Sequence, residues 1–144
     1  MKVTYPVIFT EVDTNILIEV PDLGILTQAN DEKKKKASMA EAIMMARDAI
    51  GISCIEAEDN DVKFNEASLL SQIDISKGTF ADAGVGMVSL VDVDLDVYRR
   101  KVDNKVVRTN VTLPNWLKQE AEKAGINVSK VLQEALMSKL GVYR

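Results

Sequence analysis

The chain has 144 residues, a formal net charge of −4, one cysteine and no histidine. This length fits one compact domain or a domain with a small appendage, and an apolar share of 47% with 28% charged residues is typical of a globular protein. Without histidine, a Ser-His-Asp or Cys-His triad and any zinc site that needs imidazole are excluded. The single Cys54 excludes an internal disulfide and a cysteine metal cluster. We therefore expect no cofactor.

The sequence also bears on location. It contains no apolar run near the roughly 20 residues that are needed to cross a bilayer. Residues 1–6, MKVTYP, lack the long apolar core of a signal peptide. A lone cysteine suits a reducing compartment. We expect a cytoplasmic protein without a membrane partner.

Charge is distributed unevenly along the chain. Residues 1–100 carry 10 Lys and Arg against 18 Asp and Glu, a balance of −8, whereas residues 101–144 carry 8 against 4, a balance of +4. An acidic body followed by a basic tail indicates two tasks, and a polyanion is one candidate partner for the tail. The alternative is that these cations only solvate helix faces.

Three strands are predicted at the start of the chain. Residues 3–10 and 15–20 are rich in Val, Ile, Phe and Tyr and flank a polar stretch, which predicts a hairpin. Residues 21–24, PDLG, form a turn, and residues 25–29 add a third short strand. The lysine run at 33–36 predicts a solvated loop, because adjacent like charges repel one another.

A helix is predicted next. Ser38 and Glu41 form a capping box at its start, and Gly51 is expected to end it. Its apolar stripe has the spacing i, i+3, i+4, i+7 and i+8 and consists of Ala42, Met45, Ala46, Ala49 and Ile50. Residues 56–61 are predicted to be an acidic loop and residues 66–73 a short helix.

The body is predicted to end in a strand. Residues 86–97 alternate between two faces, with Asp92, Asp94 and Asp96 together on a wet face that is also a candidate for binding a cation or a basic partner. Residues 99–105 are dense in charge and have no apolar period. We therefore predict a body over residues 1–98, a linker over 99–105 and a tail domain over 106–144.

The tail is predicted to be one strand and two helices. Residues 106–113 alternate, with Arg108, Asn110 and Thr112 on one face. Pro114 suits the first turn of a helix that ends at Gly125, and Asn127 can cap a second helix that ends at Gly141. So small a unit buries too little apolar surface to be stable alone, and its strand needs a partner. We expect a homodimer, or a higher even-numbered oligomer, through this tail.

The tail resembles a known DNA-binding family. The segments KVVRTNVTLPNWL (105–117) and AGINVSK (124–130) are similar to a ribbon-helix-helix domain. In that family, strands from two chains form a ribbon in the DNA major groove. The resemblance implies base contacts from Arg108, Asn110 and Thr112. It also implies phosphate contacts at the start of the second helix, from Asn127, Val128, Ser129 and Lys130.

The body resembles the HicB antitoxin family. The segments that carry the resemblance are YPVIF (5–9), ILIEV (16–20), PDL (21–23) and TQ (27–28), followed by an alanine-rich helix. The chain departs from the family pattern at residues 30–36. The resemblance implies an α+β fold, with an N-terminal βββα(α)β domain of partial RNase H-like type before the ribbon-helix-helix (βαα) domain. It also implies a HicA-like partner, which is a small basic toxin that cleaves mRNA.

An RNase H-like body raises the question of paired carboxylates that hold metal ions. The available carboxylates are Asp13, Glu19, Asp22, Glu41 and Asp48. No spacing forces them into one cluster, so we expect solvated or capping roles and no catalytic or metal site.

The expected function is that of an antitoxin in a type II toxin–antitoxin system, which blocks its toxin sterically and represses its own operon by binding operator DNA. Two alternatives remain at this point. One is a stand-alone ribbon-helix-helix repressor whose body senses a ligand or sets the oligomeric state. The other is a metal-dependent nuclease. The sequence does not identify the residues that contact a toxin.

Overall fold

The computed structural model describes residues 1–30, 36–103 and 105–142. Of the predicted lysine loop, residues 33–35 lie outside this part. The chain divides into two compact units, Met1–Asn104 and Lys105–Arg144. None of the described helices is both long and apolar enough to span a bilayer.

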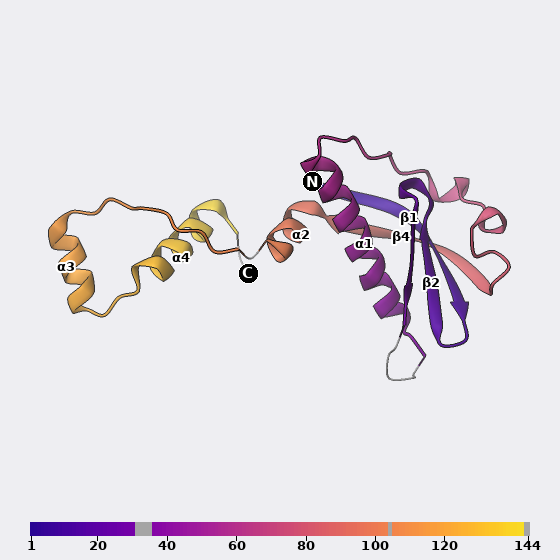
Figure 1. Ribbon diagram of the computed structural model, residues 1–144, viewed down its shortest axis with the longest axis horizontal. Helices are drawn as coiled ribbons and strands as arrows, with labels where there is room; N and C mark the ends of the chain where they lie inside the picture. Colours follow the sequence, from indigo (N-terminus) through magenta and orange to yellow (C-terminus); the bar gives the residue numbers. More distant parts are fainter. Residues whose placement is uncertain (31–35, 104, 143–144) are drawn as a thin grey trace. The chain divides into compact units, whose positions relative to one another are not determined.

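The first unit is built on an antiparallel sheet of order β3-β2-β1-β4 (Figure 1). Its strands are β1 (Lys2–Val12), β2 (Asn15–Val20), β3 (Ile25–Ala29) and β4 (Val85–Asp94). The predicted hairpin and third strand are confirmed. Together with four helices in the whole described chain, this antiparallel sheet confirms the α+β class.

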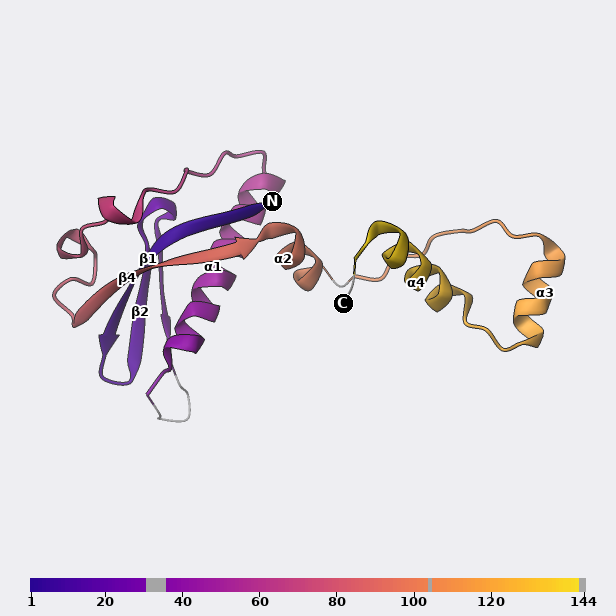
Figure 2. The same cartoon turned by 180° about the vertical axis from the view of Figure 1, so that it is seen from behind.

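Helix α1 (Met39–Asp59) packs against this sheet, as Figures 1 and 2 show from opposite sides. The predicted capping box is present: the Ser38 hydroxyl accepts the Glu41 N–H at 3.1 Å, and the Glu41 carboxylate accepts the Ser38 N–H at 3.0 Å. The buried residues of the helix recur mainly at four-residue spacing, which places them on the one face that meets the sheet. The buried residues of α1 are Ala42, Ala46, Ile50, Gly51 and Cys54. The sheet contributes Tyr5, Val7, Phe9, Ile16, Ile18, Val20, Val91 and Val93 to the same core.

The prediction that Gly51 ends this helix is wrong, because α1 continues for two more turns to Asp59. It therefore also includes residues 56–59 of the predicted acidic loop. The glycine serves packing instead of termination. A Cβ atom at Gly51 would lie 2.7 Å from Cδ1 of Tyr98, a ring that rests on this point of the helix.

We predict that Gly51→Ala lowers the free energy of unfolding by about 1–3 kcal/mol through this clash. The effect opposes helix propensity, which favours Ala over Gly by about 1 kcal/mol. In a Tyr98→Ala background, the same substitution should therefore be stabilising. Urea unfolding of the four variants at one protein concentration measures both effects. If Gly51→Ala is neutral or stabilising in the wild-type background, the packing explanation is wrong.

The end of β4 also differs from the prediction. The strand stops at Asp94, and helix α2 (Leu95–Val102) follows, so residues 99–102 are helical although a linker was predicted there. The Asp94 carboxylate caps the helix by accepting the N–H groups of Asp96 and Val97. Arg99 binds Asp59 and Glu58 of α1, each at 2.8 Å, and these bonds raise the pKa of its guanidinium. Arg99, one of the charges that suggested a linker, instead connects α2 to α1.

The segment between α1 and β4 contains only two short 3₁₀ turns, Leu70–Gln72 and Ile75–Lys77, in place of the helix predicted over residues 66–73. It is fixed by side chains of the sheet region. Asp22 accepts both the N–H and the hydroxyl of Ser68, and Glu19 accepts the N–H of Thr79 at 3.0 Å. These contacts span 46 and 60 residues, beyond the reach of local periodicity.

Cys54 is fully buried against the sheet, and this burial raises its pKa to about 11. Because the unfolded thiol ionises near pH 9, unfolding releases a proton between about pH 9 and 11. Stability from this group is complete below pH 9 and is lost as the pH rises, at a slope of up to about 1.4 kcal/mol per pH unit. We predict a steeper alkaline loss in the wild type than in Cys54→Ala when both are unfolded in urea from pH 8 to 11. Equal dependence of the unfolding free energy on pH in the two proteins would contradict this role of Cys54.

The second unit contains α3 (Asn115–Lys123) and α4 (Val128–Leu140). Both predicted helices are confirmed, and Gly125 and Gly141 after them adopt φ of +66° and +67°. The strand predicted over residues 106–113 is not formed, and residues 105–114 have no regular secondary structure. A β-strand needs a hydrogen-bonding partner, and the single chain offers none among the described residues of this unit.

Candidate functional site

The predicted base-contact residues lie before α3, within residues 105–114, which have no regular secondary structure. Arg108, Asn110 and Thr112 are all exposed, and no strand holds them on one face in the single chain. Their side chains are therefore accessible to a nucleic acid. The structure does not bring them together into a formed site.

The predicted phosphate site is at the start of α4, a helix of 13 residues. Asn127 is its N-cap, with Oδ1 accepting the N–H of Lys130 at 3.1 Å. Since the first N–H groups of a helix have no intrahelical acceptor, those of Val128 and Ser129 can donate to an anion. The cap bond leaves the Asn127 amide nitrogen as its remaining donor. All four residues are exposed.

Apolar side chains of the second unit are left uncovered. Among residues 105–142, no described side chain is buried. The large exposed apolar residues are Val106, Val107, Val111, Leu113, Trp116, Leu117, Ile126, Val128, Val131, Leu136 and Leu140. An apolar surface of this kind on so small a unit marks an interaction surface.

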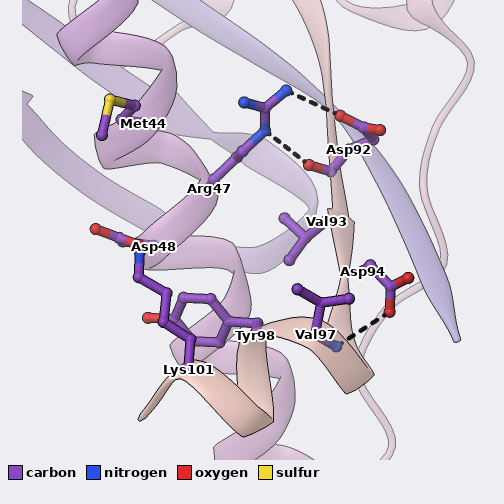
Figure 3. Close-up of a pocket in the computed structure, with 9 residues that line it drawn as sticks. All are labelled: Met44, Arg47, Asp48, Asp92, Val93, Asp94, Val97, Tyr98 and Lys101. Carbon is purple, nitrogen blue, oxygen red and sulfur yellow. Dashed lines mark hydrogen bonds and ion pairs between the residues drawn. The ribbon is translucent and has the colours of Figure 1, made fainter. Parts of the chain in front are cut away.

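The first unit has a groove of about 360 Å³ between α1, the end of β4 and α2 (Figure 3). Arg47 reaches from α1 to β4, where Nε donates to the Asp92 backbone carbonyl at 3.1 Å and Nη2 meets the Asp92 carboxylate at 3.1 Å. At the other end, Lys101 pairs with Asp48 at 3.9 Å. Met44 and Val97 provide exposed apolar edges. The groove thus has apolar walls and two ion pairs, Arg47–Asp92 and Lys101–Asp48. Asp94 adds a third carboxylate to its lining.

Sequence reasoning missed this groove. Arg47 is an isolated cation on a helix, and its partner Asp92 lies 45 residues away. The signal that was present is the alternation around Asp92, Asp94 and Asp96, but its interpretation as one wet strand face is wrong. Only Asp92 and Asp94 belong to β4, and Asp96 lies in α2.

The carboxylates considered as metal ligands have separate local tasks. Asp22 and Glu19 hold the segment before β4, Glu41 completes the α1 cap, and Asp48 pairs with Lys101. Asp13 sits in the β1–β2 turn with φ of +44°. Within the described ranges, no group of three or more His, Cys, Asp or Glu side chains is placed to hold a metal ion.

Comparison with solved structures finds a chain similar over nearly its whole length. It comes from a toxin–antitoxin complex from Streptococcus pneumoniae, with 23% sequence identity and a TM-score of 0.59. The alignment covers 96% of this chain and 99% of that chain. At this identity, the likeness shows a shared fold. No family model matches the sequence, and no curated protein matches it.

Proposed function

We propose that this chain is a HicB-like antitoxin of a type II toxin–antitoxin system. Its first unit binds and sterically blocks a small basic RNA-cleaving toxin of the HicA type. Its second unit dimerises as a ribbon-helix-helix domain, binds operator DNA and represses the operon that encodes both proteins. The observation that carries the proposal is the fold shared along 96% of the chain with a component of a toxin–antitoxin complex.

The charge of the first unit supports the toxin-binding role. A protein that holds RNA must present positive charge, and residues 1–100 have a balance of −8. Opposite charges speed the encounter of two partners and disfavour wrong ones. Blocking in this way needs no chemistry from the chain, and we propose that it has no enzymatic activity.

The exposed apolar side chains of the second unit support the DNA-binding role. If residues 106–113 of two chains pair as an antiparallel ribbon, the face formed by Val107, Val111 and Leu113 becomes covered. The opposite face then presents Arg108, Asn110 and Thr112 twice, related by twofold symmetry. A palindromic operator is the DNA counterpart of that symmetry.

The reading frame next to this gene tests the proposal. We expect a short frame that encodes a basic protein, whose expression alone stops growth and whose co-expression with the full chain restores it. A neighbouring frame without toxicity, combined with retained DNA binding by this chain, would instead support a stand-alone repressor.

A further inference from the structure

We propose that the outer edge of β4 is where this chain binds its partner, by pairing with an extended segment of that protein that carries Lys or Arg. This inference rests on the function proposed above and assigns a surface to it. Three features of the first unit support it: free backbone groups, exposed apolar side chains beside them, and a groove next to the strand with one more carboxylate than cations.

The free backbone groups follow from the register of the sheet. β4 is an edge strand that pairs only with β1 in the described part of the chain. Lys2 faces Asp94, and the next N–H, that of Leu95, donates to the Met1 carbonyl at 2.9 Å. In an antiparallel ladder, this bond means that Lys2 and Asp94 form a non-hydrogen-bonded pair. Hydrogen-bonded and non-hydrogen-bonded pairs then alternate along the two strands.

Since the register continues without a bulge to Glu11–Val85, the odd-numbered residues of β4 bond β1. The even-numbered residues turn their N–H and C=O groups away from it. The Asp92 carbonyl, which points outward by this count, indeed accepts Nε of Arg47 from outside the sheet. The N–H and C=O groups of Gly86 and Val88 and the N–H of Leu90 face the outer edge, while the Leu90 carbonyl accepts the Ser89 hydroxyl at 3.5 Å.

Exposed apolar side chains flank these groups on both faces of the strand. Met87 and Val85 are exposed on one face, and Leu90 on the other. Leu70, in the 3₁₀ turn that contacts β4, is exposed as well. A long apolar edge strand invites pairing with another chain unless charge or a bulge protects it. Among the described residues, the charge that protects this edge is Arg47, which binds the Asp92 carbonyl at one end of the strand.

The groove next to this edge, which is lined by three carboxylates and two cations, favours a basic partner. It lies between β4 and α1 (Figure 3). Alternate side chains of a strand added to this edge would project toward it. A Lys or Arg side chain there would lay its stem along Met44 and Val97. Its charge would lie near Asp48, which pairs with Lys101, and near Asp94, which caps α2. A second copy of this chain would bring a further first unit with a balance of −8. Charge therefore favours a basic protein over self-pairing.

Leu90→Lys tests the surface, and the chain provides a matched control. Leu90 on β4 is 52% exposed, and Leu26 on the opposite edge strand, β3, is 53% exposed. Each full-length variant is titrated with the basic protein that co-purifies with the wild type, after both have passed a thermal-melt check. We expect Leu90→Lys to weaken binding roughly tenfold or more and Leu26→Lys to leave it within about twofold.

Hydrogen exchange on the wild-type chain gives a second, mutation-free test. We expect the amides of Val88 and Leu90 to exchange fast in the free chain and to gain protection in the complex, while those of Ser89 and Val91 are protected in both. If Leu90→Lys binds the partner normally, or if the complex protects amides outside β4 only, the outer edge of β4 is not the binding surface. The antitoxin proposal would still stand. Protection of Val88 and Leu90 that rises with the concentration of the free chain would overturn the proposed partner surface in favour of self-pairing. If no basic partner is found, the proposed function itself fails.

Discussion

Val111→Asp is expected to convert the full chain from a dimer to a monomer and to lower its operator affinity by at least about 100-fold. In the proposed ribbon, Val111 lies on the covered face, so each chain would bury an unpaired carboxylate. The desolvation penalty of such a charge is several kcal/mol per ion, and the dimer contains two. Light scattering after gel filtration measures the mass, and a gel-shift titration measures the loss of DNA binding.

Val106→Asp is the matched control. The same charge is introduced into the same segment, but Val106 belongs to the opposite face of the predicted strand, together with Arg108. This variant should remain a dimer. A Val111→Asp chain that remains dimeric at micromolar concentration would show that the two chains do not associate through this ribbon.

Arg108→Ala and Asn110→Ala are expected to abolish preference for the operator while leaving the toxin neutralised. A bidentate contact between Arg and guanine, or between Asn and adenine, contributes about 1–3 kcal/mol of discrimination. A dimer makes each contact twice, so each substitution should cost about 2–6 kcal/mol of specific binding. Gel shifts with the operator and with a scrambled duplex measure this specificity, and growth rescue measures neutralisation.

Lys130→Ala provides the contrast, because a phosphate contact carries no sequence information. It should weaken binding to operator and scrambled DNA alike and reduce the salt dependence of both. The division of labour between the two units would be contradicted if Arg108→Ala or Asn110→Ala abolished neutralisation and left operator binding intact.

Local signals in the sequence predicted local structure. The capping box at Ser38 and Glu41, the β1–β2 hairpin and the Asn127 cap each depend on residues a few positions apart, and all three are present. The errors occur where a residue far away in the sequence determines the local structure. Gly51 has the sequence signature of a helix end, but Tyr98, 47 residues later, requires a glycine there. Arg99 lies in a charged segment that resembles a linker in the sequence, but the fold pairs it with Glu58 and Asp59 of α1.

The candidate sites divide in the same way. Polar and apolar residues alternate over 106–113, as in a β-strand. A strand there needs a second chain to pair with, so the role of these residues remains a prediction. The edge of β4 could not be identified from the sequence, because its exposure depends on the strand order β3-β2-β1-β4. The groove beside it joins Arg47 to Asp92 across two elements, which no spacing rule connects.

Purification of the native chain from its own source cells shows whether it holds an RNA-cleaving partner inactive. Proteins that co-purify are identified by mass, separated from the chain under denaturing conditions, refolded and assayed on RNA. We expect one stoichiometric, small, basic protein that degrades RNA when it is alone and loses this activity when the chain is added back. A clean dimer that binds DNA and carries no such partner would contradict it.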